Sequence, residues 1–346
     1  MKPYAPACRT AWHPMGRRCC GWQIVLALLW AVLCLPTLQA GAQSRPARIG
    51  FIGGGSGFGQ LPPHAAFLQG MRDQGLVQGR DFVVEFRSTG GDPMRRAALA
   101  EELVRLPVDT FLVGVCGMEL DLVRRLTATI PIVVMTCNED MVESGLVKSL
   151  NRPGGNITGQ SKFAPQLAAK RLELLREVLP TARRVAVLWN PDYSAFTQDW
   201  RELRAAATQL GFTLEPVEFR RASELDAAFS AIERLRPDAL MTFSDVSTYV
   251  SSKQLAERAM AARLPSVFAF REIADAGGLM SYGPSIPGMA RHAASYFARI
   301  LRGAAPGDLP IEMPTRFEMV INQKAAKALG IKIPQVVLLR ADEVIE

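Results

Sequence analysis

The sequence predicts an α/β protein with two doubly wound parallel-sheet lobes joined by a multi-strand hinge. Short apolar, β-rich segments alternate with helical patterns, which favours parallel sheets covered by helices. A dense cluster of turn-forming residues interrupts the alternation at residues 151–156, and the pattern then restarts. A second, glycine-flanked interruption at residues 277–284 is typical of a hinge segment that absorbs dihedral change. Two halves of similar size with such connections indicate a hinged clamp.

In the first half, apolar β-rich runs predict strands and amphipathic runs predict helices. Strands are expected at residues 48–53, 82–86, 110–115 and 132–135. Helices are expected at residues 63–74, 92–105 and 119–128. Asp92 and Pro93 begin the second helix, because aspartate is a preferred N-cap and proline suits the first helical position.

The second half repeats this alternation. Strands are expected at residues 184–189, 213–219, 239–243 and 266–268. Helices are expected at residues 165–179, 195–210 and 250–262, with a further helix opened by the cap Ser223. After the second crossing, the amphipathic helix at residues 289–301 should pack back on the first lobe. A strand at 317–321 and a helix at 324–329, stopped by Gly330, are predicted to form a third crossing.

These elements divide the chain into lobes. Lobe 1 is expected to comprise residues 43–157 and 283–316, and lobe 2 residues 158–282. Residues 317–346 are interpreted as a C-terminal segment that spans the hinge.

The first 42 residues have the pattern of a secretory signal peptide. Lys2, Arg9, Arg17 and Arg18 form a basic start without acidic residues, residues 24–35 are apolar, and Ala40-Gly41-Ala42 resembles a cleavage signal. The apolar run of 12 residues is shorter than the roughly 20 that a membrane span needs. We therefore expect an exported, periplasmic protein.

Removing this leader changes the composition. The formal net charge falls from +7 to +3, because all four charged leader residues are basic. No basic run indicates nucleic acid as a partner, and no second apolar run approaches membrane length. The remaining 304 residues are enough for two domains of about 150 residues each.

Two cysteines, Cys116 and Cys137, remain after removal of the leader, and both fall at the ends of neighbouring predicted strands. We expect them to be buried, unpaired thiols, because neighbours on a sheet are not always aimed for a bridge. A disulfide is the alternative that an oxidising compartment allows.

Ligands of open parallel sheets bind beyond the carboxyl ends of the strands, so the loops at those ends hold the candidate site. The predicted ligand-binding residues are Gly55, Ser56, Phe58, Cys116, Gly117, Met118, Asn138, Asp140, Asn190, Tyr193, Ser244, Asp245, Phe270, Arg271 and Tyr282.

Each group of candidates has a functional and a structural interpretation. The glycine loop at residues 53–59 lacks the dinucleotide fingerprint, but it could bring backbone and Ser56 close to a ligand, with Phe58 as a stacking face. It could equally be a mobile surface loop. The amides of residues 116–118 could bind a carboxylate at a helix start. Tyr193 and Phe270 could sandwich a ring, or pack at the rim.

Acidic residues outnumber basic ones in these loops. Asn138 is followed by Glu139 and Asp140, and Asp245 and Glu272 lie in facing loops. Arg271 is the positive charge that partly balances these carboxylates. This charge would suit an ammonium group. The alternative is that individual carboxylates are helix caps or salt-bridge partners.

The pattern does not favour an enzyme. After the leader, the histidines are His64 and His292, no nucleophile elbow is present, and no His or Cys pair has metal-ligand spacing. No catalytic residue, metal or cofactor is therefore expected, and His64 is interpreted as an exposed residue at a helix start.

Four longer motifs carry a resemblance to a known family. They span residues 146–159, 270–284, 300–310 and 340–346. Together they resemble the ABC-transporter substrate-binding family that contains tryptophan- and tyrosine-binding receptors. The resemblance implies a type I periplasmic-binding-protein fold, with solute held between two lobes and delivered to a membrane permease powered by a separate ATPase.

The resemblance supports Asp140, Asn190 and Pro191 as site residues. The sequence also departs from the family, with Met141 in place of a common proline and residues 116–119 in place of a small-residue loop. These departures mean that an aromatic amino acid is not implied as the ligand.

We therefore expect a monomeric periplasmic receptor that delivers a small solute, an amino acid or related compound, to an ABC importer. The alternative is a periplasmic ligand sensor for a membrane kinase or chemoreceptor, which would have the same fold and pocket. An exported hydrolase would require a pocket residue such as Ser56 or His64 as a catalytic group.

Overall fold

The computed structural model describes residues 45–53, 58–89, 94–162, 165–193 and 196–346. The chain divides into two units, Met1–Arg45 and Pro46–Glu346, and all helices and strands below lie in the second. The predicted signal peptide lies outside the described residues.

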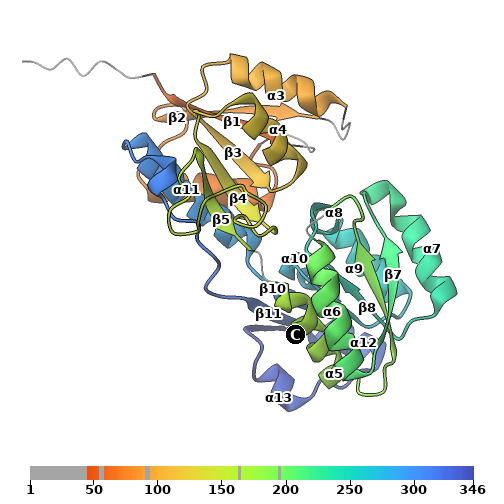
Figure 1. The fold of residues 1–346 in the computed structure, drawn as a ribbon. Helices are drawn as coiled ribbons and strands as arrows, with labels where there is room; N and C mark the ends of the chain where they lie inside the picture. Colours follow the sequence, from red (N-terminus) through yellow and green to blue (C-terminus); the bar gives the residue numbers. More distant parts are fainter. Residues whose placement is uncertain (1–44, 54–57, 90–93, 163–164, 194–195) are drawn as a thin grey trace, which may run out of the picture. The chain divides into compact units, whose positions relative to one another are not determined.

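The first sheet has five parallel strands in the order β2-β1-β3-β4-β5 (Figure 1). The strands are β1 (Ala47–Gly53), β2 (Phe82–Ser88), β3 (Thr110–Val115), β4 (Ile132–Cys137) and β5 (Ile157–Ser161). Four of them confirm the predicted strands. The fifth, β5, falls where the sequence was interpreted as a crossing, because the preceding turn residues obscure its five-residue length.

Helices cover this sheet, and the last of them comes from far along the chain. They are α2 (Pro62–Asp73), α3 (Arg95–Arg105), α4 (Met118–Leu126) and α11 (Ile286–Leu301). Phe67 of α2 packs edge to face on Phe297 of α11, at a centroid distance of 5.1 Å. This contact confirms that the helix after the second crossing packs on the first lobe. Helix α11 begins earlier than predicted because Ser285 caps it, accepting a hydrogen bond from the Gly288 amide.

The second sheet has seven strands in the order β12-β11-β10-β9-β8-β6-β7. They are β6 (Arg184–Trp189), β7 (Thr213–Glu218), β8 (Ala239–Thr242), β9 (Ser266–Phe268), β10 (Met280–Gly283), β11 (Glu318–Asn322) and β12 (Glu343–Ile345). All neighbouring pairs are parallel except β10 with β11. Two largely parallel sheets, each with its own helices, confirm the predicted fold class.

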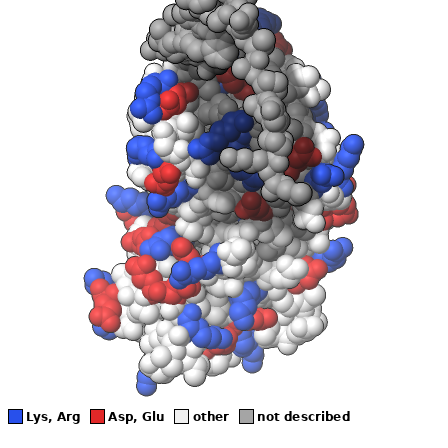
Figure 2. Space-filling model, turned by 90° about the vertical axis from the view of Figure 1, so that its left-hand side faces the viewer, with Lys and Arg blue, Asp and Glu red and all other residues white. Residues whose placement is uncertain are grey.

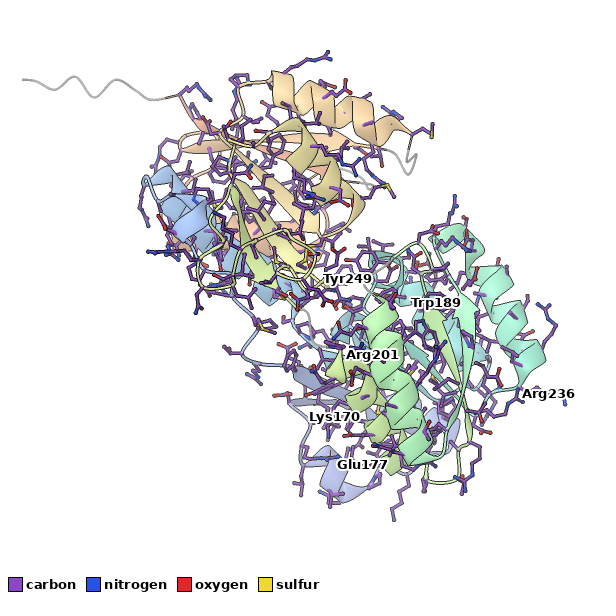
Figure 3. The ribbon with its side chains drawn as sticks, viewed as in Figure 1. Lys170, Glu177, Trp189, Arg201, Arg236 and Tyr249 are labelled. Atoms are coloured by element: carbon purple, nitrogen blue, oxygen red, sulfur yellow. A yellow bond between two sulfur atoms is a disulfide. The ribbon has the colours of Figure 1, made fainter. Side chains whose placement is uncertain are left out.

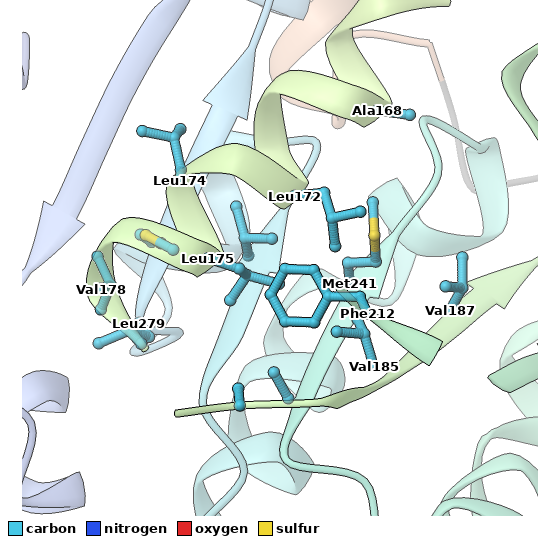
Figure 4. Packing of buried hydrophobic residues seen from close by; sticks show 14 of the residues in the cluster. Ala168, Leu172, Leu174, Leu175, Val178, Val185, Val187, Phe212, Met241 and Leu279 are labelled. Atoms are coloured by element: carbon cyan, nitrogen blue, oxygen red, sulfur yellow. The ribbon is translucent and has the colours of Figure 1, made fainter. Parts of the chain in front are cut away.

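Helices on both faces bury the second sheet. They are α5 (Gln166–Val178), α6 (Phe196–Leu210), α7 (Leu225–Leu235), α8 (Val246–Val250), α9 (Ser252–Ala261), α10 (Arg271–Asp275), α12 (Gln323–Leu329) and α13 (Gln335–Leu338). Figure 4 shows one side of this core, where Leu172 and Leu175 of α5 lie over Val185, Val187 and Met241 of the strands. Apolar side chains recur along α5 at helical spacing, which is why this face is buried.

The C-terminal segment differs from its prediction. Residues 317–346 do not span the hinge; β11 pairs with β10 and β12 pairs with β11, so the segment extends the second sheet. Burial explains this placement, since Met319, Ile321 and Val337 join the core of that sheet. The chain passes between the sheets just before, where the Ile311 and Glu312 amides donate to backbone carbonyls of Leu150 and Gly159.

The surface carries charges of both signs. Figure 2 shows Lys and Arg side chains interspersed with Asp and Glu over the coloured part of one face. Within the described ranges, none of the helices has the length and apolar character needed to cross a membrane.

Candidate functional site

A cavity of about 450 Å³ lies at the carboxyl ends of strands from both sheets. This is the edge where ligands of parallel sheets bind. Its lining comes from both halves of the chain and consists of Phe51, Ile52, Gly53, Leu61, Pro63, His64, Phe86, Gly114, Val115, Glu119, Met135, Thr136, Lys162, Tyr193, Ser244, Asp245, Val246, Tyr249, Val250, Phe270 and Ile286.

Aromatic rings line the part of the cavity that the first sheet provides. Phe51 of β1 stacks on Phe86 of β2, with centroids 5.7 Å apart and planes 20° apart. His64 of α2 packs edge to face on Phe51 at 4.8 Å and lies parallel to Phe58 at 4.6 Å. Phe58 itself is not among the lining residues, so it supports the wall rather than forming it.

The structure corrects the interpretation of His64 as an exposed residue. Its exposed fraction is 8 %. Burial lowers the pKa of the imidazole to about 4, because the charged form would lose its hydration. His64 is therefore a neutral ring of the aromatic wall.

Two further rings of the cavity lining, Tyr249 and Phe270, come from the second half of the chain. Tyr249 of α8, labelled in Figure 3, packs edge to face on Phe270 with centroids 5.1 Å apart. The Tyr249 hydroxyl donates to Oε1 of Glu272 at 3.1 Å. That hydrogen bond holds the tyrosine ring against the cavity.

Among the lining residues that the structure describes, Lys162 is the cationic one, and the sequence analysis did not indicate it. It follows β5, and its exposed fraction is 6 %. Nζ donates to Oγ of Ser244 at 2.6 Å and lies 5.4 Å from the centroid of the Phe270 ring. Burial lowers the pKa of Lys162 to about 8, opposed by the negative charges of Asp245 and Asp199.

Asp245 lies next to Ser244 and is buried. Its carboxylate caps α8 by accepting from the Ser247 amide at 2.7 Å, and it also accepts from Nδ2 of Asn190 at 3.4 Å. Burial raises the pKa of this carboxyl group, and the Ser247 hydrogen bonds oppose the rise. The predicted candidates Asn190, Ser244 and Asp245 are thus brought together.

Tyr193 reaches from the end of β6 to the loop after β3. Its hydroxyl donates to the Cys116 carbonyl oxygen at 3.2 Å. Gly117 has a φ of 102°, and a Cβ placed there would lie 3.3 Å from Cε2 of Tyr193. Glycine is therefore required both by the backbone conformation and by the close approach of the tyrosine.

The structure also corrects the expectation of two unpaired thiols. Cys116 and Cys137 form a disulfide, with Cα atoms 4.8 Å apart. The parallel register aligns Val115 with Thr136, so the next residue on each strand faces the other across the sheet edge. The bridge ties together the two loops that follow β3 and β4.

A buried polar group lies close to Lys162. It contains Asp199 of α6 and Arg171 of α5, both less than a tenth exposed. Burial raises the pKa of Asp199 to about 6, opposed by Arg171, Asn138 and Lys162. Arg171 donates to the Tyr282 carbonyl oxygen at 3.1 Å, so its charge lies next to strand β10.

Comparison with known protein families assigns the chain to one of them. A family model described as "ABC transporter substrate binding protein" matches residues 61–345. The chain belongs to this family. Its members are solute-binding proteins that work with a permease and are not enzymes.

A curated relative and a solved structure are each similar to most of this chain. A protein named "Tyrosine-binding protein" from Clostridioides difficile is 24 % identical over 283 residues, covering 80 % of this chain and 81 % of the relative. A solved Vibrio cholerae structure, titled a conserved domain protein, has a TM-score of 0.77 and 26 % identity, covering 86 % of this chain and 99 % of its own.

A further solved structure has a ligand in its title. It is the ABC domain from Streptococcus pneumonia in complex with L-Trp, with a TM-score of 0.76 and 23 % identity. It covers 87 % of this chain and 100 % of its own. At this identity the likeness shows the shared fold.

Several predicted site residues of this substrate-binding protein lie outside the cavity lining. Asp140 accepts from the Val142 and Glu143 amides and so stabilises its own turn. Arg271 forms ion pairs with Asp275 of its own helix, with Glu318 of β11 and with Glu343 of β12, and the last two join α10 to those strands. Arg271 is therefore held by ion pairs outside the cavity lining, whereas Lys162 lies within the lining.

The remaining candidates are placed as follows. Met118 is 60 % exposed, and Asn138 is buried near Asp199. The Tyr282 ring lies 6.2 Å from Phe317, outside the cavity lining. Gly55 and Ser56 lie outside the described residues. Of the fifteen candidates, the cavity brings together Tyr193, Ser244, Asp245 and Phe270 as lining residues.

Proposed function

We propose that this chain is the exported, periplasmic receptor of an ABC importer and carries a small amphiphilic solute, an amino acid or related organic acid, to the permease. The observation that carries this proposal is one cavity that combines aromatic walls with the buried side chains of Lys162 and Asp245 and the half-buried Ser244. A solute with an apolar body and a charged end would match this combination of apolar and charged groups.

The size of the cavity supports a small solute. Its volume of about 450 Å³ falls within the roughly 300–1,000 Å³ of small-molecule sites. Phe51, Phe86, Tyr249 and Phe270 offer large apolar faces on more than one side. Burial of a ring between such faces gives both hydrophobic and quadrupolar attraction.

The shared lining supports a binding mechanism by closure. The first sheet with its helices and the second sheet with its helices are proposed as the two lobes, and both contribute side chains to the cavity. A solute that contacts both stabilises the arrangement in which both sets of contacts form. Its higher affinity for that arrangement is what shifts the population toward closure.

The relatives support an amino acid or a close analogue as the solute class. One curated relative is named for tyrosine binding and one solved relative contains L-Trp. The departures at residues 116–119 and the buried Lys162 are features of this chain that its own ligand must match.

Calorimetric titration tests the proposal. Protein should be unfolded and refolded first, to remove any solute that copurifies. We expect one-to-one binding of at least one of L-tryptophan, L-tyrosine, L-phenylalanine or their des-amino acids, and no heat with glucose. Phe270→Ala should weaken binding at least tenfold, whereas Val336→Ala, at an exposed position, should not. Absence of binding to every acid tested would contradict the proposal.

Export has its own test. Sequencing the amino terminus of protein from the periplasmic fraction should give Gln43 as the first residue. Retention of residues 1–42 in a cytoplasmic fraction would contradict the proposed localisation.

A further inference from the structure

Among the residues that the structure describes, the buried ammonium group of Lys162 has no close counter-ion. Within the described ranges, no carboxylate oxygen lies within 4.0 Å of Nζ, although Asp245 and Asp199 act on it from further away. Burying a charged group without an ion pair is unfavourable. Binding of an anion next to the Lys162 ammonium group would therefore be electrostatically favourable.

The hydrogen bonds of Lys162 leave capacity for such a ligand. An ammonium group has three N–H donors. One is directed to Oγ of Ser244 at 2.6 Å, and the contact with the Ser244 carbonyl oxygen is long, at 3.5 Å. Because Oγ accepts from Lys162, the Ser244 hydroxyl proton is available to donate. Lys162 and Ser244 together offer two donors, which is what the two oxygens of a carboxylate require.

The carboxylates of the cavity lining already have partners. Asp245 accepts from the Ser247 amide and from Asn190. Glu119 pairs with Arg96 at 3.3 Å. A ligand ammonium would have to compete with these contacts. A ligand carboxylate would instead meet Lys162 and Ser244, which have no partner of opposite charge within 4.0 Å among the described residues.

We propose that Lys162 and Ser244 bind the carboxylate of the solute and that an amino group on the solute is dispensable. This inference rests on the proposed function and narrows it. The ligand class is an aromatic monocarboxylic acid, with or without an α-amino group. Its ring would lie against Phe270 and Tyr249, next to the Lys162 ammonium group.

Matched probes separate the carboxylate from the amino group. Calorimetric titration should compare 3-phenylpropionate, L-phenylalanine and 2-phenylethylamine, and the corresponding indole series. We expect the des-amino acid to bind within tenfold of the amino acid in at least one series, and the amine to bind at least a hundredfold more weakly. Binding of the amine as tightly as the acid would overturn the inference.

Variants test the assigned residues. Lys162→Met should lower the affinity for the acids at least fiftyfold, and Ser244→Ala at least fivefold. Lys170→Met, which removes an exposed lysine of α5, is the matched control and should leave affinity unchanged. Wild-type affinity in the Lys162→Met variant would overturn the inference while leaving the receptor function intact. Failure of the wild-type protein to bind any probe would instead remove the proposed function itself.

The pH dependence of the wild-type protein provides a second readout that does not depend on a variant folding. Asp245, Asp199 and Arg171 are the charged groups that act on Lys162. Since its pKa is about 8 in the absence of ligand, affinity for 3-phenylpropionate should be constant from pH 6.5 to 7.5 and fall toward tenfold per pH unit above 8. A flat profile from pH 6.5 to 9.5 would contradict a role for the lysine charge.

Discussion

His64 illustrates how a single residue joins the site through its neighbours. Its ring is parallel to Phe58 and perpendicular to Phe51, and both partners come from other segments. A local pattern assigns a histidine at a helix start to the surface, because it contains no information about the strand and loop that cover it. The neutral ring is the result of that burial.

The lowered pKa of His64 predicts a pH-dependent stability. The folded state binds fewer protons than the unfolded state between pH 6.5 and 4, so the free energy of unfolding falls as the pH falls through this range. The loss should approach about 3 kcal/mol at pH 4. Urea unfolding of His64→Phe should lack this loss relative to the wild-type protein.

The raised pKa of Asp199 has the opposite effect on the pH dependence of stability, so this residue provides a control for the His64 experiment. Its pKa is raised to about 6 in the folded state, so it favours folding as the pH falls from 6 toward 3.8. The comparison between wild type and His64→Phe should therefore be repeated in an Asp199→Asn background. If the His64→Phe substitution left the pH profile unchanged in both backgrounds, the imidazole would not be buried.

At the scale of elements, helices α2 and α11 approach closely at Gly70. A Cβ on Gly70 would lie 2.2 Å from the Arg291 carbonyl oxygen and 2.8 Å from the Ala294 Cβ. Gly70→Ala should therefore destabilise the protein by roughly 1–3 kcal/mol, because backbone atoms of α11 must move. Thermal unfolding measures this. Gly155→Ala, where no atom lies within 4 Å, is the control; an equal loss in both variants would contradict the packing described.

The disulfide is the covalent link between the ends of β3 and β4. It closes a loop with a sequence separation of 21 residues, for which the loss of unfolded-state entropy corresponds to about 3 kcal/mol. The Cys116→Ala, Cys137→Ala double variant should lose a stability of that order in urea unfolding. The difference from the wild-type protein should disappear when both are unfolded under a reducing agent. A difference that persists under reduction would indicate a packing effect instead.

Periodic elements could be predicted from the sequence, and elements defined by long-range pairing could not. Strands such as Arg184–Trp189 are apolar runs bounded by turns, which a local pattern shows. Lys162 was missed because residues 151–159 were interpreted only as a crossing, so no strand, and hence no strand-end loop, was expected there. The three-residue strand Glu343–Ile345 exists through its pairing with β11, which leaves no periodic signal.

At the scale of the whole molecule, the two sheets contribute complementary parts of one cavity. The aromatic rings Phe51, His64 and Phe86 come from the first sheet and its helix, and Lys162 follows β5 of the same sheet. Ser244 and Phe270 follow β8 and β9 of the second sheet. Neither half alone surrounds a solute. The proposed function therefore requires that binding of an unreacted solute is coupled to the relative position of the two lobes.

Small-angle X-ray scattering with and without ligand measures that coupling most directly. Refolded, solute-free protein should show a smaller radius of gyration when it is saturated with the tightest acid found by calorimetry, and the acid should be recovered chemically unchanged. Lys162→Met at the same ligand concentration should show no decrease. An acid that binds with one-to-one stoichiometry but leaves the radius of gyration of the wild-type protein unchanged would contradict a receptor that closes on its solute.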